Sequence, residues 1–185
     1  MFKSTLRTAV AAAAVSFIAF AAHAKDPMVG GAAMYPSKNI IENAVNSKDH
    51  TTLVAAVKAA GLVDTLEGKG PFTVFAPTNE AFAALPRGTV EMLLKPENKA
   101  KLTKILTCHV VAADAMSMTV KKMIKDDGGE HDITTVGGCI IKATQMKGKI
   151  TLTDENGDVA HVTIADVKQS NGVIHVVDKV LLPKM

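Results

Sequence analysis

Two histidines in apolar, strand-like segments are the first candidates for chemistry. His109 lies in CHVV and His175 lies in VIHVVD. An imidazole beside a carboxylate can act as a general base, so one hypothesis is a hydrolase that uses either histidine with Asp114, Asp166 or Asp178. The competing interpretation is a half-buried imidazole bonded to backbone or carboxylate groups. We expect this structural role for both histidines, because the hydrolase requires its carboxylates to converge on one pocket.

Other arrangements for nucleophilic catalysis are missing from the sequence. No GxSxG or SxxK motif occurs, and GKG at 68–70 is too short for a phosphate-binding loop. Cys108 directly precedes His109, and neighbouring residues of a strand point to opposite faces. The sequence therefore predicts no enzyme and no cofactor.

The segment DENGD at 154–158 resembles the start of a calcium-binding loop. Such a loop needs glycine at its sixth position and glutamate at its twelfth, where this chain has Val159 and Ala165. Asn-Gly between two alternating segments is typical of a hairpin turn. We expect a hairpin here and no bound metal.

The stretch TVFAPTNEAFAAL at 73–85 changes from strand-like to helix-like at Pro77. Proline suits a strand end because it lacks the N–H that a β-ladder needs. Thr78 or Asn79 can cap the following helix, and Glu80 lies in its first turn, where the helix dipole favours negative charge. The stretch is predicted to be a structural joint with one true cap.

Residues 1–24 have the pattern of a signal peptide. A basic start is followed by an apolar run and by Ala22-His23-Ala24, so we expect cleavage between Ala24 and Lys25. Removing Lys3 and Arg7 leaves 19 basic and 18 acidic residues, a balance that does not suggest nucleic-acid binding. The sequence after residue 24 contains no apolar run long enough to predict a membrane span. The mature protein is expected to be exported, either periplasmic or secreted.

Two cysteines remain in the mature chain. In an exported protein two cysteines usually pair, so the sequence predicts a disulfide between Cys108 and Cys139. The alternative is two buried free thiols, with Cys108 as a small apolar side chain.

The elements that would position these residues are helices first and strands later. Apolar residues recur at helical spacing up to about residue 125, and five alternating segments separated by Gly-containing turns follow residue 130. The strand ending at Pro77 must join that later sheet. The predicted class is α+β with mainly antiparallel strands and several short helices.

The domain is expected to occupy residues 37–185. Residues 25–36 have no periodicity and are expected to be a flexible lead-in. Ser37 is the expected N-cap of the first helix, and Asp49 or Thr51 that of the second.

Three segments together resemble the fasciclin-like domain family. GPFTVFAPTNEAFAAL (70–85) is similar to its first motif, NGVIHVVDKVLLP (171–183) to its closing motif, and LTKILTCHVV (102–111) to its central segment. The resemblance spans about residues 37–183. It implies a wedge of β-strands flanked by helices, and structural roles for the motif residues Thr73, Phe75, Pro77, Thr78, Asn79, Phe82, Asn171, Gly172, His175 and Asp178.

The resemblance also implies a function. It is an adhesion or interaction role without catalysis, directed at an unidentified protein or a cell-surface or matrix component. The central segment of the family often carries a Tyr-His pair linked to receptor binding in animal members. His109 matches the histidine, which makes His109, Val110 and Val111 candidate partner contacts. Cys108 replaces the tyrosine, which weighs against an integrin-type role. A small-ligand carrier, which would need an apolar pocket, is a further alternative.

Overall fold

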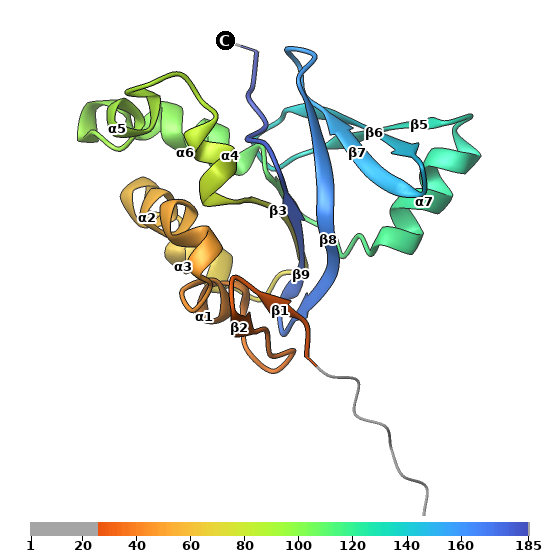
Figure 1. The fold of residues 1–185 in the computed structure, drawn as a ribbon, viewed down its shortest axis with the longest axis horizontal. Coiled ribbons are helices and arrows are strands. Elements are labelled where there is room, and N and C mark those ends of the chain that lie inside the picture. The colour runs from red at the N-terminus through yellow and green to blue at the C-terminus, as the bar shows by residue number, and fades with distance from the viewer. Residues whose placement is uncertain (1–25, 185) are drawn as a thin grey trace, which may run out of the picture.

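The change of periodicity near residue 130 separates a helix-rich from a strand-rich part of the fold. The computed structural model of the protein describes residues 26–184, and its longer strands follow residue 130 except for the one at 72–77 (Figure 1). The α+β class with a mainly antiparallel sheet is confirmed. The expected cleavage site at Ala24 and Lys25 lies outside the described residues.

Seven strands form the main sheet: β3 (Phe72–Pro77), β4 (Val110–Val111), β5 (Glu130–Thr134), β6 (Ile140–Met146), β7 (Lys149–Thr153), β8 (Val159–Gln169) and β9 (Gly172–Val177). Their order is β4-β3-β9-β8-β7-β6-β5. β3 and β9 pair in parallel, with Phe72 opposite Gly172, and the other neighbours pair antiparallel. The sheet thus joins its early strand to its last one.

Helices flank the sheet as α1 (Ile40–Ala44), α2 (Thr51–Ala60), α3 (Val63–Glu67), α4 (Asn79–Ala83), α5 (Thr89–Leu93), α6 (Lys99–Thr107) and α7 (Ser117–Asp126), with 3-10 turns η1 (Lys48–His50) and η2 (Pro96–Asn98). α1 to α6 gather on one side of β3 and β9, and α7 lies beside β5 and β6 (Figure 1). The N-cap of α1 is Asn39, not Ser37, because Asn39 and Glu42 form a reciprocal capping box.

Two hydrophobic cores lie on opposite faces of β3 and β9, because successive strand residues point to opposite sides. The helical core contains Ile41, Leu53 and Val57 from helices, and Val74 and Ile174 from strands. The sheet core packs α7 against the antiparallel strands and contains Phe75, Val120, Ile141, Leu152 and Val177. Strand β8 connects the two, and its pairing with β9 is interrupted by two register shifts.

The lead-in at 25–36 was expected to be flexible, and this expectation is wrong for its central part. β1 (Met28–Val29) pairs with β2 (Ala32–Ala33) across Gly30 and Gly31. Both glycines have positive φ (58° and 77°), the conformation that a tight two-residue hairpin needs. Val29 and Met34 are buried in the helical core. The short strands lack a recognisable period, which is why the sequence did not predict them.

Among residues 26–184, no helix combines the length and the hydropathy needed to cross a bilayer.

Candidate functional site

His109 is a buried bridge between α6 and the C-terminal segment. Its Nε2 accepts a hydrogen bond from the Leu181 N–H at 2.9 Å, so the proton lies on Nδ1, which donates to the Ile105 carbonyl at 2.8 Å. Burial lowers the pKa of His109 to about 4, although the Ile105 carbonyl and the Asp154 carboxylate oppose the shift. The imidazole is therefore neutral at physiological pH.

This placement corrects the expectation of a partner contact for His109 and Val110, whereas for Val111 it stays a prediction. His109 is 2% exposed and Val110 is 6% exposed, while Val111 is partly buried. The physical reason is that β4 is only two residues long and follows the end of α6 closely. The C-terminal segment then covers the imidazole through Leu181.

His175 is a second neutral bridge, in the middle of β9. Its Nδ1 accepts a hydrogen bond from the Asp166 N–H at 3.2 Å, and Nε2 donates to the Ala115 carbonyl at 2.8 Å. Burial lowers the pKa of His175 against the opposing effects of the Ala115 carbonyl, Asp166 and Asp114. The ring also stacks on Phe75 at a centroid distance of 5.9 Å. Both bridging histidines bond to the backbone, as the structural hypothesis expected.

Among the described residues, no carboxylate of the hydrolase hypothesis hydrogen-bonds to either histidine, although Asp166 and Asp114 lie near enough to His175 to act on its pKa. Asp166 directs its side chain to Ser117, accepting from its N–H at 2.6 Å and from its hydroxyl at 2.5 Å. Asp178 accepts from the backbone N–H of His161 at 2.7 Å and contacts its Nδ1 at 3.0 Å. The nucleophile–base–acid geometry that the hydrolase requires is therefore not built around His109 or His175.

The joint at 77–80 holds two helices. Thr78 caps α4, with its hydroxyl accepting from the Ala81 N–H at 3.3 Å. Asn79 instead caps α2, accepting from the Thr52 N–H at 3.0 Å and donating to the Lys48 carbonyl at 2.8 Å. As expected, only one of the two residues, Thr78, caps the helix that follows, and the additional finding is that Asn79 caps an earlier helix.

Asp49 and Thr51 were the expected caps of α2, yet the cap comes from a residue 27 positions away in the chain. Neither η1 nor α2 has a cap of its own, since no side-chain bond is made by Ser47 or His50 to their first N–H groups. Of the other residues with expected structural roles in the first motif, Thr73, Phe75, Pro77 and Phe82 are buried. Thr73 is fully buried and bonds to the backbone of Ala113 and Ala115.

The closing motif ties the first helices to the sheet. Asn171 accepts from the Ile40 N–H at 3.1 Å and donates to the Leu66 carbonyl at 2.7 Å, so it links α1 to α3. Gly172 faces the Phe72 carbonyl so closely that a Cβ atom would collide with that backbone. These residues position the fold.

Cys108 and Cys139 are joined in a disulfide, with their Cα atoms 5.4 Å apart. Cys108 follows α6 and Cys139 precedes β6, so the bond connects the helical side to the antiparallel side of the molecule. Both are buried at 1% and 3% exposure.

The segment 154–158 forms the turn between β7 and β8. The Asp154 carboxylate accepts from the N–H groups of Asn156, Asp158 and Leu182 at 2.8 to 3.0 Å. It therefore fixes both the turn and the C-terminal segment. Within the described part of the chain, no three His, Cys, Asp or Glu side chains gather in a way that could hold a metal.

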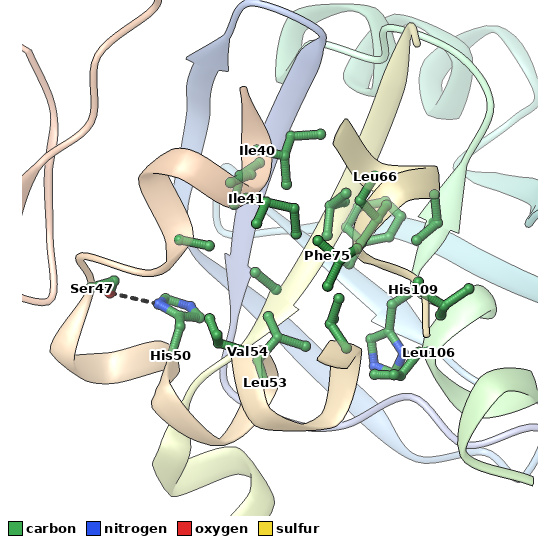
Figure 2. Close-up of a pocket in the computed structure, with 18 of the residues that line it drawn as sticks. Ile40, Ile41, Ser47, His50, Leu53, Val54, Leu66, Phe75, Leu106 and His109 are labelled. Carbon is green, nitrogen blue, oxygen red and sulfur yellow. Dashed lines mark hydrogen bonds between the residues drawn. The ribbon is translucent and has the colours of Figure 1, made fainter. Parts of the chain in front are cut away.

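A cavity of about 50 Å³ lies in the helical core, and no stretch of the sequence reveals it. Apolar side chains from α1, α2, α3 and the two parallel strands line it, together with Ser47, His50 and His109 (Figure 2). Small-molecule sites usually measure about 300–1,000 Å³, so the cavity as it stands is too small for a drug-sized ligand.

Ser47 and His50 form a hydrogen-bonded pair beside this cavity, with 2.8 Å between Oγ and Nδ1 (Figure 2). The residues are 2% and 3% exposed. Gly30 covers the hydroxyl so closely that a Cβ atom there would collide with it. A substrate cannot reach the Ser47 oxygen in this arrangement, so the pair positions the imidazole. The i, i+3 spacing in SKDH was the sequence signal for it.

Comparison with known proteins identifies the family. A model of the fasciclin domain matches residues 48–183. Protein sll1483 of Synechocystis sp. is 47% identical over 161 residues, covering 87% of this chain and 82% of that protein. The transforming growth factor-beta-induced protein ig-h3 of Sus scrofa is 36% identical over 137 residues, which are 71% of this chain and 17% of that protein.

A solved structure has the same fold. It contains a FAS1 domain pair from the insect cell adhesion molecule fasciclin I, and it aligns with a TM-score of 0.70 and 18% identity over 78% of this chain and 51% of that one. The motifs, the family match and the shared architecture lead to one conclusion: the chain belongs to the fasciclin domain family.

Proposed function

We propose that the mature chain is an exported, non-catalytic domain that binds another protein or a cell-surface or matrix component. The observation that carries this proposal is the use of the motif side chains. Thr78, Asn79, Asn171 and both bridging histidines make internal hydrogen bonds that hold elements together. Their chemistry supports a rigid scaffold with an outward binding surface.

Export is part of the same proposal. The signal-like residues 1–24 and the disulfide both suit an oxidising compartment, periplasmic or extracellular. We expect N-terminal sequencing of the protein recovered outside the cytoplasm to begin at Lys25. A retained Met1, or a start within the apolar run, would contradict this.

Exposed apolar side chains supply the candidate contacts. Met118 on α7 is 76% exposed, and Met146 and Ile140 on β6 are 57% and 51% exposed. Large exposed apolar side chains are where protein interfaces gain most of their binding energy.

The test is adhesion of envelope or matrix material to the immobilised mature chain. We compare the wild type with Met118→Asp, Met146→Asp and, on the opposite side of the molecule, Met92→Asp, which replaces a 42% exposed side chain of α5. A variant in the binding surface should lose at least about tenfold in affinity, or about 1.4 kcal/mol, with unchanged melting. The proposal fails if no component binds saturably, or if each of the three variants binds as tightly as the wild type.

A further inference from the structure

The helical layer is divided into two packed pairs. α1 packs on α3 and α2 packs on α6, and the cavity of about 50 Å³ is lined by residues of both pairs and of the parallel strands. Ile40 and Ile41 of α1 line it from one side, and Leu53 and Val54 of α2 from another (Figure 2). Its interior is therefore mainly aliphatic and suits an apolar occupant.

The cavity approaches the surface at a rim of less buried side chains. Among its lining residues, Ala44, Val54 and Leu62 are partly buried, and Lys58 is exposed. Val54 and Lys58 are four residues apart, so they lie one turn apart on the same face of α2. The stem of a lysine packs along apolar surface while its ammonium stays in water. The rim of the cavity therefore carries a positive charge.

Lys58 is the one side chain charged at neutral pH among the described residues that line the cavity. No carboxylate is among them, and burial lowers the pKa of His50 and of His109, so both rings are neutral. No ion pair joins Lys58 to another residue of the described range 26–184. An apolar interior with one unpaired ammonium at its rim suits a ligand that has an apolar body and a single negative charge.

We propose that this cavity binds a short, unbranched monocarboxylate, whose alkyl chain contacts the aliphatic lining and whose carboxylate pairs with Lys58 at the rim. The alkyl chain gains free energy by leaving water. The carboxylate stays at the surface, so it avoids the cost of burying a charge, which a second charge further along the chain would incur. This site is separate from the proposed outward binding surface and does not depend on it.

The size of the cavity limits the length of the chain. One water-sized group occupies roughly 10–15 Å³ by this kind of measure, so about 50 Å³ holds about three to five non-hydrogen atoms. Pentanoate, in which four carbons precede the carboxylate, is the matching probe. A longer chain must extend past Ala44 and Leu62 into water and gains less from each further carbon.

The experiment is an NMR titration of the mature chain labelled with ¹³C in its isoleucine methyl groups. We expect pentanoate to shift the Ile41 and Ile174 resonances saturably, and to leave those of Ile141 and Ile150 in the sheet core unchanged. Affinity should rise about fourfold per added CH₂ from propanoate upward and level off once the chain fills the cavity. Pentanamide, a neutral analogue of the same shape, should bind about threefold more weakly, a modest difference because the ion pair at Lys58 is exposed to water.

Three variants complete the test. Lys58→Met should lose the preference for pentanoate over pentanamide, and Lys125→Met, at an exposed position of α7, should keep it. Val57→Ile adds one methyl group to the lining, so the affinity should level off about one carbon earlier in the series. Lys58 and Lys125 are both exposed, and unchanged melting of their variants checks that they fold like the wild type.

Two results would overturn the proposal. The absence of a saturable shift of the cavity methyl groups up to the solubility limit would mean that no carboxylate enters. Equal affinity of the wild type for the two probes, or a preference that survives Lys58→Met, would mean that the cavity accepts apolar chains without recognising a carboxylate.

Discussion

The helical core and the sheet core differ in how completely they are filled. The helical core contains the cavity of about 50 Å³. The sheet core is closed around Ala143, Leu152 and Val177, each at 0% exposure. Strands in register, with one helix across them, bring their side chains together at fixed spacing. In the helical core two helix pairs lie on the same sheet and meet along a seam, so the packing of these short helices leaves space for the cavity.

Removing the disulfide should have the largest effect, because this bond connects the helical side of the molecule to its antiparallel side. Cys108 and Cys139 are 31 residues apart, and a loop of that length gives about 3.5 kcal/mol of stabilisation. We expect the Cys108→Ser/Cys139→Ser variant to lose about this free energy of unfolding in a urea titration. The wild type should lose the same amount on reduction, and the variant should not respond to reductant. Two thiols that react with a blocking agent in the oxidised, unfolded protein would contradict the bond.

Acid should weaken the contact that His109 makes between α6 and the C-terminal segment. The pKa of His109 is about 4 in the folded chain and about 6.5 when unfolded. Above pH 6.5 both states are neutral, so this group adds no pH dependence there. Below it the unfolded chain binds a proton that the folded chain refuses, and stability falls until about pH 4. The loss from this residue alone should reach about 3 kcal/mol.

Urea titrations at pH 7 and pH 4.5 measure this effect. His109→Gln should show a smaller loss between the two pH values than the wild type, and His161→Gln, at an exposed position, should show the full loss. The pKa values of His50 and His175 are also lowered by burial, so part of the acid sensitivity should remain in His109→Gln. An equal loss in all three proteins would contradict the assignment.

The same substitution in the two cores should have opposite effects. Val57 in α2 borders the cavity and Val120 in α7 lies in the sheet core, at 5% and 2% exposure. We expect Val57→Ile to fill space and stabilise by about 0.5–1 kcal/mol. Val120→Ile should overpack and destabilise by about 1–3 kcal/mol. Thermal melting of both variants measures the difference, and changes of the same sign and size would remove the contrast between the cores.

The smallest expected effects concern the caps at the joint. Loss of a cap costs about 0.5–2 kcal/mol. Asn79→Ala should lie at the upper end, because Asn79 bonds to Thr51, Thr52 and Lys48, whereas Thr78→Ala removes one bond of 3.3 Å. Hydrogen exchange should increase in α2 for Asn79→Ala and in α4 for Thr78→Ala. Faster exchange in the same helix for both variants would contradict the division of labour.

Local patterns predicted much of this molecule. The alternating segments after residue 130 and their Gly-containing turns gave the antiparallel strands, and the position of Pro77 gave the end of β3. The apolar segments around His109 and His175 predicted buried imidazoles bonded to backbone or carboxylate groups, and the structure shows backbone partners for both. His109 itself precedes β4 and does not lie in a strand. These features depend on residues that are neighbours in the sequence, so a single sequence is enough to predict them.

Features that depend on distant packing could not be predicted. Asn79 caps a helix that precedes it by 27 residues, so its role exists only once α4 and α2 meet. The burial of Val110 depends on the fold around a two-residue strand. The cavity arises from how two helix pairs share one sheet, and no residue type marks it in advance. The Ser47–His50 spacing was visible, but its enclosure beneath Gly30 was not.

The parallel pairing of β3 with β9 has a consequence for the order of events in folding. Phe72 faces Gly172, so the central contact of the sheet forms only when almost the whole chain is available. Pairings over such sequence distances slow folding, because a long loop must close first. Because the N-terminus is synthesised first, neither core can be completed until β9, the last strand, is available. If the chain is exported as proposed above, this delay would keep the polypeptide unfolded during translocation and let the native state form once transport has ended.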